Sequence, residues 1–278
     1  MVQLFNGDCL EVMKGIPDKS VDLIICDLPY GCLATGYRAS AIHPQTTNPN
    51  QNKSKTEFKT EPCAWDIKID LDAFWKEVRR IRKSDHTPTI HFCTTKFGYD
   101  LIKSNEKEFR YDLVWDKQRG VSFLSANKMP MRSHEMIYVF SKAGAFYNRV
   151  DITGDYKSYS VKKDGIPSVA STQYGGSMRV ESNGGDGKRC ALSIISERGG
   201  NRNTNGHPTE KPMELYKWLI ERYSKEGDTI LDPTAGSFNS CAAAVELKRK
   251  AIGIEKNEKF FKKAEERFAP NEIISPTD

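Results

Sequence analysis

Four consecutive residues, Asp27, Leu28, Pro29 and Tyr30, carry the groups needed to hold a flat ring with an exocyclic amine. Tyr30 offers an aromatic face for stacking, and the Asp27 carboxylate accepts amine hydrogens. Pro29 biases Leu28 toward an extended backbone, which would aim the Leu28 carbonyl at the same amine. A strand ending in a proline turn with a core tyrosine would have the same sequence, so a second site is needed to choose between the two.

Residues 228–255 form that second site, because their pattern is typical of the nucleoside-binding half of a Rossmann-like sheet. A strand at 228–231 and a helix at 238–249 flank a turn, and the strand at 251–254 ends in Glu255. Glu255 can accept both hydroxyls of a ribose, and small residues in the turn let the backbone approach a ligand. The predicted ligand-binding turn consists of Asp232, Pro233, Thr234, Ala235, Gly236 and Ser237.

The turn lacks the Gly-x-Gly-x-x-Gly spacing of a diphosphate cradle. Asp232 at the strand end instead favours an amine-bearing ligand. A ligand with a ribose, an adenine and an amino-acid ammonium suits both Asp232 and Glu255, and S-adenosylmethionine is such a ligand. An ordinary βαβ unit that binds nothing stays open at this point.

A hexapeptide between the two sites, His207 to Pro212, has the features of a helix start. Thr209 is predicted to cap a helix that begins near Pro212. Lys211 at the same helix start would bind a carboxylate, and S-adenosylmethionine carries one. A structural cap alone would also explain this motif.

Strand-like and helix-like segments alternate along the chain, which predicts an α/β fold with a mostly parallel sheet and helices on both faces. The strand at 136–140 follows the strand at 110–115 without an obvious helix, so these two are expected to pair antiparallel at the edge. The other strands are expected at 21–26, 88–93, 228–231 and 251–254, and the helices at 71–83, 211–224, 238–249 and 257–268.

Two polar stretches interrupt this alternation. Residues 33–64 are turn-rich and predict a mobile loop that closes over Tyr30, or else a surface insertion without a role. Residues 146–204 are rich in Gly, Ser and Asn, and contain nine Lys and Arg against six Asp and Glu. Basic residues interleaved with tyrosines suit nucleic acid, although a solvated loop-rich subdomain has a similar composition. The predicted nucleic-acid contacts are Tyr30, Arg38, Lys53, Lys162, Lys163, Arg179, Lys188, Arg189, Arg198 and Arg202.

The predicted organisation is therefore one catalytic domain formed by 1–145 and 205–270, a target-recognition region at 146–204, and a tail at 271–278.

The amino-acid composition limits the possible partners, location and metal content of the protein. The net charge of +5 permits a polyanionic partner. The chain contains no apolar run long enough to span a membrane. Seven cysteines without a Cys-x-x-Cys pair, and histidines without metal-ligand spacing, predict free thiols, a cytoplasmic location and no metal site.

These motifs together resemble the DNA amino-methyltransferases in their β arrangement, with the catalytic motif first and the cofactor motifs last. Asp27-Leu28-Pro29-Tyr30 resembles the family's catalytic Asp-Pro-Pro-Tyr, and the hexapeptide from His207 resembles its His-Pro-Thr-Gln-Lys-Pro motif. Residues 231–237 resemble its cofactor turn, and residues 113–117 resemble a later strand of the catalytic half. Asn6-Gly7-Asp8-Cys9-Leu10 resembles the short motif whose acid contacts the cofactor adenine.

The resemblance implies an S-adenosylmethionine-dependent methyltransferase that methylates N6 of a flipped-out adenine in double-stranded DNA. It implies Asp27, Leu28, Pro29 and Tyr30 as catalytic residues. The implied cofactor contacts are Asp8, Cys9, Asp27, His207, Thr209, Lys211, residues 232–237 and Glu255. The resemblance also allows a homodimer and a cognate restriction enzyme as partners.

Three alternatives are weighed beside adenine methylation. Relatives that act on cytosine N4 often carry Ser where this chain has Asp27, so the aspartate favours adenine. A protein-glutamine methyltransferase uses a similar tetrapeptide, but the basic middle region and the late cofactor block oppose it. A DNA-binding protein without catalysis is the alternative from another class. The chain departs from the family pattern at Leu28, Thr234 and Phe238, where Pro, Phe and Gly are usual.

Overall fold

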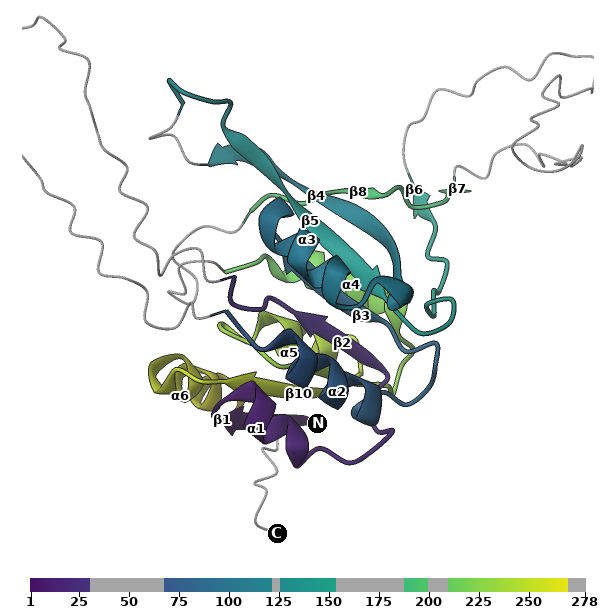
Figure 1. Ribbon diagram of the computed structural model, residues 1–278, viewed down its shortest axis with the longest axis vertical. Helices are drawn as coiled ribbons and strands as arrows, with labels where there is room; N and C mark the ends of the chain where they lie inside the picture. Colours follow the sequence, from purple (N-terminus) through teal and green to yellow (C-terminus); the bar gives the residue numbers. More distant parts are fainter. Residues whose placement is uncertain (31–67, 122–125, 154–187, 200–209, 270–278) are drawn as a thin grey trace, which may run out of the picture. The chain divides into compact units, whose positions relative to one another are not determined.

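An eight-stranded sheet organises the larger part of the molecule (Figure 1). The computed structural model describes residues 1–30, 68–121, 126–153, 188–199 and 210–269. Residues 1–148 and 193–278 belong to one compact unit, and residues 149–192 to another. In the first unit the strands lie side by side in the order β1 (Val2–Asn6), β10 (Lys250–Glu255), β9 (Thr229–Asp232), β2 (Leu23–Cys26), β3 (Thr89–Cys93), β5 (Arg132–Phe140), β4 (Phe109–Val121) and β8 (Ile194–Ser196).

The first five strands of this order, β1 to β3, run parallel, and β5 runs antiparallel to β3. The predicted antiparallel pairing of the strands around 110–115 and 136–140 is confirmed, because β4 and β5 form a long hairpin. Two strands of this sheet were not predicted. β1 adds a parallel edge beside β10, and the short β8 pairs parallel to β4, outside the hairpin.

In the described part of the chain, three helices cover each face of the sheet, and helices on both faces are what the alternating pattern predicts. The buried residues of α1 (Cys9–Lys14), α2 (Leu71–Ile81) and α3 (Thr95–Ser104) pack into one apolar core. Those of α4 (Met213–Tyr223), α5 (Asn239–Glu246) and α6 (Glu258–Phe268) pack into a second core on the opposite face. α1 and α3 are additions to the predicted helices. The predicted α/β fold, Rossmann-like and covered on both faces, is therefore confirmed.

The central strands are buried along their whole length because both of their faces are covered. All four residues of β2 and all five residues of β3 are buried. His91 on β3 lies in this core, where it packs edge-on against the rings of Phe74, Trp75 and Phe140. Burial lowers the pKa of His91 to about 3, and neither ring nitrogen has a hydrogen-bond partner among the described residues. The imidazole is therefore a neutral part of the core.

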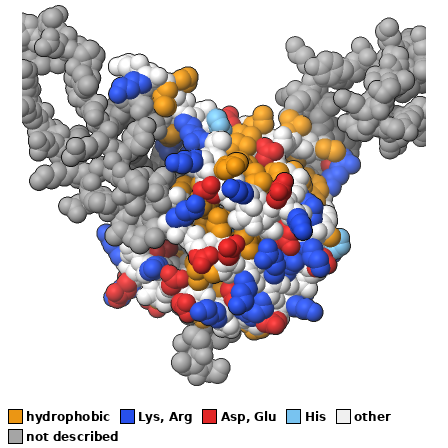
Figure 2. All heavy atoms as spheres, viewed as in Figure 1, with side chains coloured by type: hydrophobic (Ala, Val, Ile, Leu, Met, Phe, Trp, Pro, Cys, Tyr) orange, Lys and Arg blue, Asp and Glu red, His pale blue; other side chains and the backbone are white. Residues whose placement is uncertain are grey.

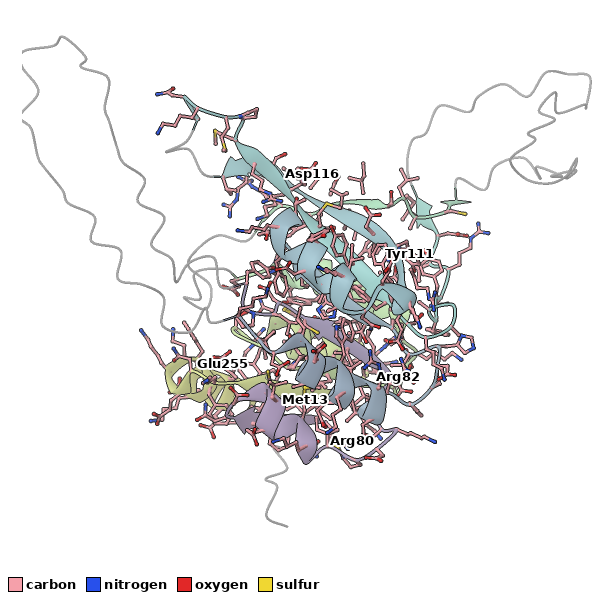
Figure 3. The ribbon with its side chains drawn as sticks, in the orientation of Figure 1. Met13, Arg80, Arg82, Tyr111, Asp116 and Glu255 are labelled. Carbon is pink, nitrogen blue, oxygen red and sulfur yellow. The ribbon has the colours of Figure 1, made fainter. Side chains whose placement is uncertain are left out.

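Arg80 ties α2 to the end of α1 (Figure 3). Its guanidinium donates to the Met13 carbonyl at 2.6 Å and to the Ile16 carbonyl at 2.7 Å, and forms ion pairs with Asp18 and Glu77. It thereby bonds one carbonyl in the last turn of α1 and one just beyond the end of that helix. Around this region the surface carries Lys and Arg intermixed with Asp and Glu (Figure 2).

α5 begins and ends with residues in left-handed backbone conformations. Phe238 precedes the helix at φ 58° and Lys248 follows it at φ 61°, so the helix ends at Glu246, before the predicted boundary at 249. Phe238 is fully buried and packs over Gly253 of β10, where an added Cβ would lie 2.7 Å from its ring. The phenylalanine that replaces a usual glycine is thus a core residue.

The second unit contains a short antiparallel pair, β6 (Ile152–Thr153) and β7 (Lys188–Arg189). Much of the predicted recognition region, the predicted loop at 33–64 and the tail at 271–278 lie outside the described residues, so these assignments stay predictions. Among the described residues, five cysteines are free thiols. No helix in the described part of the chain has the length and apolar character needed to cross a membrane.

Candidate active site

The two predicted sites lie at the carboxyl ends of neighbouring parallel strands, β2 and β9. From β9 the chain continues through α5 to β10, and from β2 it continues through α2 to β3 on the opposite side. The two strands therefore flank a topological switch point, where open α/β sheets bind ligands. A direct bond joins the two ends, because the Asp27 backbone N–H donates to the Thr234 hydroxyl at 3.2 Å.

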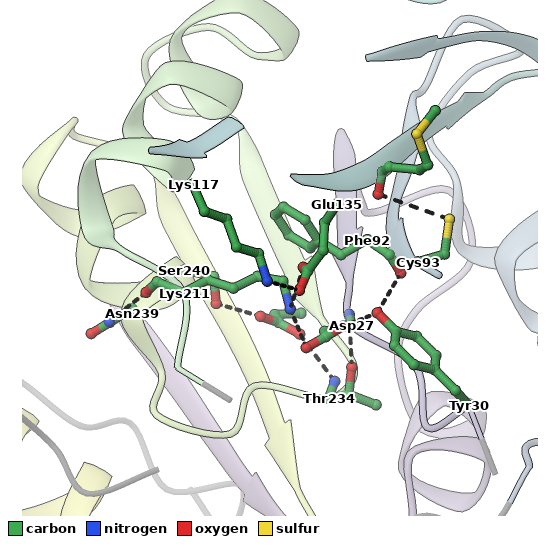
Figure 4. A network of polar contacts seen from close by, with 12 residues as sticks. Asp27, Tyr30, Phe92, Cys93, Lys117, Glu135, Lys211, Thr234, Asn239 and Ser240 are labelled. Carbon is green, nitrogen blue, oxygen red and sulfur yellow. Dashed lines mark hydrogen bonds and ion pairs between the residues drawn. The ribbon is translucent and has the colours of Figure 1, made fainter. Parts of the chain in front are cut away.

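Asp27 is the centre of a network of polar contacts (Figure 4). Its Oδ1 accepts from the Tyr30 hydroxyl at 2.6 Å, and its Oδ2 pairs with the Lys211 ammonium. The Asp27 side chain is 24% exposed, so the carboxylate remains open to a ligand on one side. The predicted acceptor for an exocyclic amine is thus held between two donors.

The Tyr30 ring leans on Phe97 of α3, with 5.0 Å between ring centroids and 34° between planes. Its hydroxyl also lies 3.0 Å from the Phe92 carbonyl oxygen on β3. Burial raises the pKa of Tyr30 well above its ordinary value, and the Asp27 charge adds to this, so the hydroxyl stays protonated as a donor. The ring is consequently placed beside the carboxylate, as the prediction of a stacking face requires.

Asp232 lies at the end of β9 and is 3% exposed. Its carboxyl accepts from the Ser240 hydroxyl and from the Thr234 backbone N–H at 3.0 Å. Burial raises the pKa of Asp232 to about 7. No positively charged side chain among the described residues forms an ion pair with this buried carboxyl, which suits the binding of an ammonium group.

Glu255 ends β10 on the other side of the same turn. Its carboxylate accepts from the Gly236 N–H at 2.9 Å and from the Asn257 N–H at 2.7 Å. Gly236 adopts φ 53°, a left-handed conformation that glycine takes without strain. Burial raises the pKa of Glu255 above its ordinary value. The turn and the acid predicted to bind a ribose are therefore in direct contact.

Asp8 and Cys9 lie at the end of β1, the strand beside β10. The Gly7 N–H donates to the Glu255 carbonyl at 3.1 Å, which brings the two strand ends together. The Asp8 carboxylate caps α1 by accepting from the Leu10 N–H at 3.0 Å. Burial raises the pKa of Cys9 to about 12, so its thiol is neutral and inert as a nucleophile. Both residues belong to the same sheet edge as the turn.

Lys211 departs from its predicted place. The ammonium is 5% exposed and faces Asp27, rather than standing at an open helix start. Helix α4 begins at Met213 with Pro212 at its cap position and no side-chain cap bond from that residue, and Thr209, which was predicted to cap the helix, lies outside the described residues. Proline lacks the side-chain oxygen that a cap supplies. The carbonyl of Lys211, the residue before it, accepts from the Asn239 amide at 2.9 Å.

The sequence reasoning missed Glu135 as a site residue and named Lys117 only within a strand motif. Glu135 on β5 lies 3.8 Å from the Lys211 ammonium and pairs with Lys117 on β4. An acid next to the apolar run of β5 is the signal that could have indicated it. The predicted residues Arg38, Lys53, Lys162, Lys163, Arg179, Arg202, His207 and Thr209 lie outside the described residues.

Three predicted nucleic-acid residues other than Tyr30 are described. Arg198 is exposed next to β8, in the unit that contains the site. Lys188 and Arg189 form β7 in the other unit. The structure therefore brings together the catalytic and cofactor-turn residues, and leaves the contacts to nucleic acid as predictions.

Comparison with known proteins places this site in a family. The chain is 27% identical over 290 residues to the type II methyltransferase M.HinfI of Haemophilus influenzae, covering 97% of this chain and 70% of the relative. It is 27% identical over 277 residues to the DNA adenine methyltransferase YhdJ of Escherichia coli K12, covering 93% and 80%.

Solved structures share the fold at low identity. The S-adenosylmethionine complex of M1.HpyAVI matches with a TM-score of 0.57 at 17% identity, over 96% of this chain and 99% of that one. The cytosine-N4-specific PvuII DNA methyltransferase matches with a TM-score of 0.60 at 15% identity, over 98% and 88%. The sequence pattern of the N6/N4 methyltransferases matches residues 21–266, nearly the whole chain. This chain belongs to the DNA methylase family.

Proposed function

We propose that this protein is an S-adenosylmethionine-dependent DNA methyltransferase that modifies the exocyclic N6 amine of adenine. The observation that carries the proposal is the contact between the two halves of the site. The Asp27 carboxylate and the Tyr30 ring lie beside the turn that begins at Asp232, joined through the Thr234 hydroxyl. A base acceptor and a cofactor turn in contact are what a direct transfer between two bound molecules requires.

The residues of the turn fit the cofactor. Asp232 is a buried carboxyl suited to the amino-acid ammonium, and Glu255 is placed to accept ribose hydroxyls. Asp8 and Cys9 follow the end of the adjacent strand β1, which the Gly7 N–H joins to Glu255, and we assign them to the adenine side of such a ligand. When bound, S-adenosylmethionine supplies a methyl group that its sulfonium makes electrophilic.

The target base must leave the helical stack before its amine can enter this site. Tyr30 offers the face on which the base lies, and Asp27 accepts a hydrogen from the amine. The amine lone pair is delocalised into the ring, so acceptance by Asp27 and by the Leu28 carbonyl favours a more pyramidal, more nucleophilic nitrogen. The same carboxylate stabilises the positive charge that develops on the nitrogen. It can also accept the proton that the nitrogen loses, directly or through a water.

Adenine is favoured over cytosine by Asp27, and by the similarity to a relative named a DNA adenine methyltransferase. Cytosine N4 methylation is the second candidate, since a cytosine-specific enzyme shares the fold. The predicted recognition region at 146–204, a homodimer and a cognate restriction enzyme belong to this proposal as well. None of these is needed for the chemistry at Asp27.

The test is to incubate the protein with S-adenosylmethionine and DNA, digest the DNA, and identify methylated nucleosides by mass spectrometry. We expect N6-methyladenine from the wild-type protein and none from Asp27→Ala, whose thermal unfolding should stay cooperative. Detection of N4-methylcytosine instead would show that the protein is a DNA methyltransferase whose target base is cytosine. A wild-type protein that binds DNA but methylates neither base would leave only the DNA-binding alternative.

A further inference from the structure

A chain of alternating charges runs from the site into the sheet. It begins at Asp27, continues through the Lys211 ammonium and the Glu135 carboxylate, and ends at Lys117 (Figure 4). Its members come from the end of β2, the segment before α4, and strands β5 and β4. Asp27, Lys211 and Lys117 belong to sequence motifs that resemble the family, but Glu135 does not, so it requires a separate explanation.

Lys211 cannot lie where it does without carboxylates around it. Its side chain is 5% exposed, and its ammonium lies 4.7 Å above the Phe92 ring centroid, which is a favourable floor for a cation. A buried ammonium without opposite charges would lose its proton. Burial does oppose the charge, but Asp27 and Glu135 hold the pKa of Lys211 above its ordinary value. The cation is thus shared between one reacting carboxylate and one fixed carboxylate.

Glu135 is the fixed partner. Its backbone lies within the paired part of β5, opposite Trp115 of β4, so the sheet sets its position. Lys117 holds Oε1, and the buried Oε2, 3.8 Å from Lys211, has no hydrogen-bond partner among the described residues. Although burial opposes it, Lys211 and Lys117 hold the pKa of Glu135 below its ordinary value, so it remains a carboxylate.

We propose that Glu135 is a positioning residue for methyl transfer, which anchors the Lys211 ammonium so that Asp27 Oδ2 stays tied and Oδ1 faces the target amine. This inference rests on the proposed function. Asp27 follows the last residue of β2, where its side chain could rotate, and Lys211 alone would move with it. With Glu135 as a second, sheet-bound anchor, the ammonium fixes one carboxylate oxygen and leaves the other for the substrate.

The charged groups around Lys211 come from several elements. Asp27 after β2, Glu135 on β5 and Asp232 on β9 favour its charged form, and Lys211 in turn acts on Cys93 of β3. Lys117 on β4 and Arg132 on β5 act on Glu135. Of these, Glu135 is the negative group that takes no direct part in binding the base or the cofactor. Its removal therefore changes the charge near Lys211 without removing a ligand contact.

The test compares Glu135→Gln with Glu108→Gln, a matched control. Glu108 is also a mostly buried carboxylate paired to two cations, with Arg82 at 3.0 Å and Arg79 at 3.9 Å, but it lies away from the site. We expect Glu135→Gln to lower kcat about tenfold or more, since small misplacements of a reacting group have large effects on rate. The KM for S-adenosylmethionine should change by less than about twofold. Glu108→Gln should reduce thermal stability with kcat unchanged.

The pH profile of kcat gives a readout that a purely structural role would not move. Without the Glu135 charge Lys211 loses its proton more easily, so the high-pH decline in kcat should begin at a lower pH than in the wild type. The double variant Glu135→Gln/Lys117→Gln removes the outer pair without changing net charge. It should show the same loss of kcat, and it keeps the test valid if the single variant fails to fold.

Wild-type activity separates the two proposals. If the wild type methylates DNA but both Glu135 variants keep its kcat and pH profile, the positioning role is wrong and the proposed function stands. An equal loss of kcat in Glu108→Gln, or a change confined to KM, would also overturn the positioning role. If the wild type methylates neither base, both proposals fail together.

Discussion

At the scale of single residues, both carboxylate oxygens of Asp27 already have a partner within the protein. Tyr30 donates to one of its oxygens and Lys211 pairs with the other, so a target amine has to compete with the tyrosine hydroxyl for Oδ1. The hydroxyl has an alternative acceptor in the Phe92 carbonyl at 3.0 Å. Tyr30 can therefore release Asp27 without leaving its own hydroxyl unpaired.

This arrangement separates the roles of the Tyr30 ring and the Tyr30 hydroxyl. We expect Tyr30→Phe to change kcat by no more than about fivefold, because one hydrogen bond contributes about 1 kcal/mol. Tyr30→Ala should lower kcat/KM by about 10- to 100-fold, since base stacking contributes about 1–3 kcal/mol. Single-turnover methylation of the same DNA by both variants measures the difference. Equal losses in the two variants would argue against a stacking role.

Asp232 makes cofactor binding depend on pH. The carboxyl must be ionised to attract an ammonium, and burial raises its pKa to about 7. Binding of a cation lowers that pKa in the complex, so affinity is full above pH 7 and falls as the pH drops through it. Between pH 7.5 and 5.5 we expect the affinity for S-adenosylmethionine to fall by about 20-fold. Titration calorimetry measures the change.

The control for this pH dependence is Asp232→Asn, which keeps the shape of the side chain and removes its proton equilibrium. Its affinity should be low and nearly constant over the same pH range. An α-amino group with a pKa of about 7.7 is already more than half protonated at pH 7.5, so its own titration changes the affinity by less than about twofold, and in the opposite direction. A wild-type affinity that stays constant with pH would mean that Asp232 does not bind the ammonium.

At the scale of elements, the sequence predicts well wherever a pattern is local. The apolar run from Leu23 to Cys26 predicts a buried strand, and α2 repeats buried residues at helical spacing. Short edge strands such as β8 were missed because a three-residue run has no period to detect. The end of α5 was placed too late, since its stop is a left-handed Lys248 rather than a glycine.

The hydrogen bond between Thr234 and Asp27 connects two strand ends, and the sequence could not predict it. Thr234 is unusual for the family, and the sequence suggests only a changed packing contact. In the fold its hydroxyl accepts from the Asp27 backbone, 207 residues away in the chain, and so joins the ends of β9 and β2. Contacts of this kind depend on strand order, which no local pattern contains.

At the scale of the whole molecule, the strands follow one order along the chain and a different order across the sheet. The neighbouring strands β2 and β9 come from opposite ends of the sequence, and the motifs that follow them meet only because the sheet brings those ends together. The resemblance of the motifs predicted this meeting. Glu135 matches no such motif, and its contacts with Lys211 and Lys117 depend on β5 lying between β3 and β4 in the folded sheet.

A site assembled from both ends of the chain should couple cofactor binding to global stability. A ligand that binds only the folded state stabilises it by about 2.7 kcal/mol at 100 times its Kd. For a protein of this size that corresponds to a rise in Tm of roughly 5–10 °C. S-adenosylmethionine should produce this shift in the wild type and in Glu108→Gln. At the same ligand concentration Glu255→Gln should show a smaller shift, because its side chain accepts ribose hydroxyls less strongly. A DNA-binding protein without a cofactor site would show no shift at all, so thermal unfolding with and without the ligand discriminates the two functions before any methylation is measured.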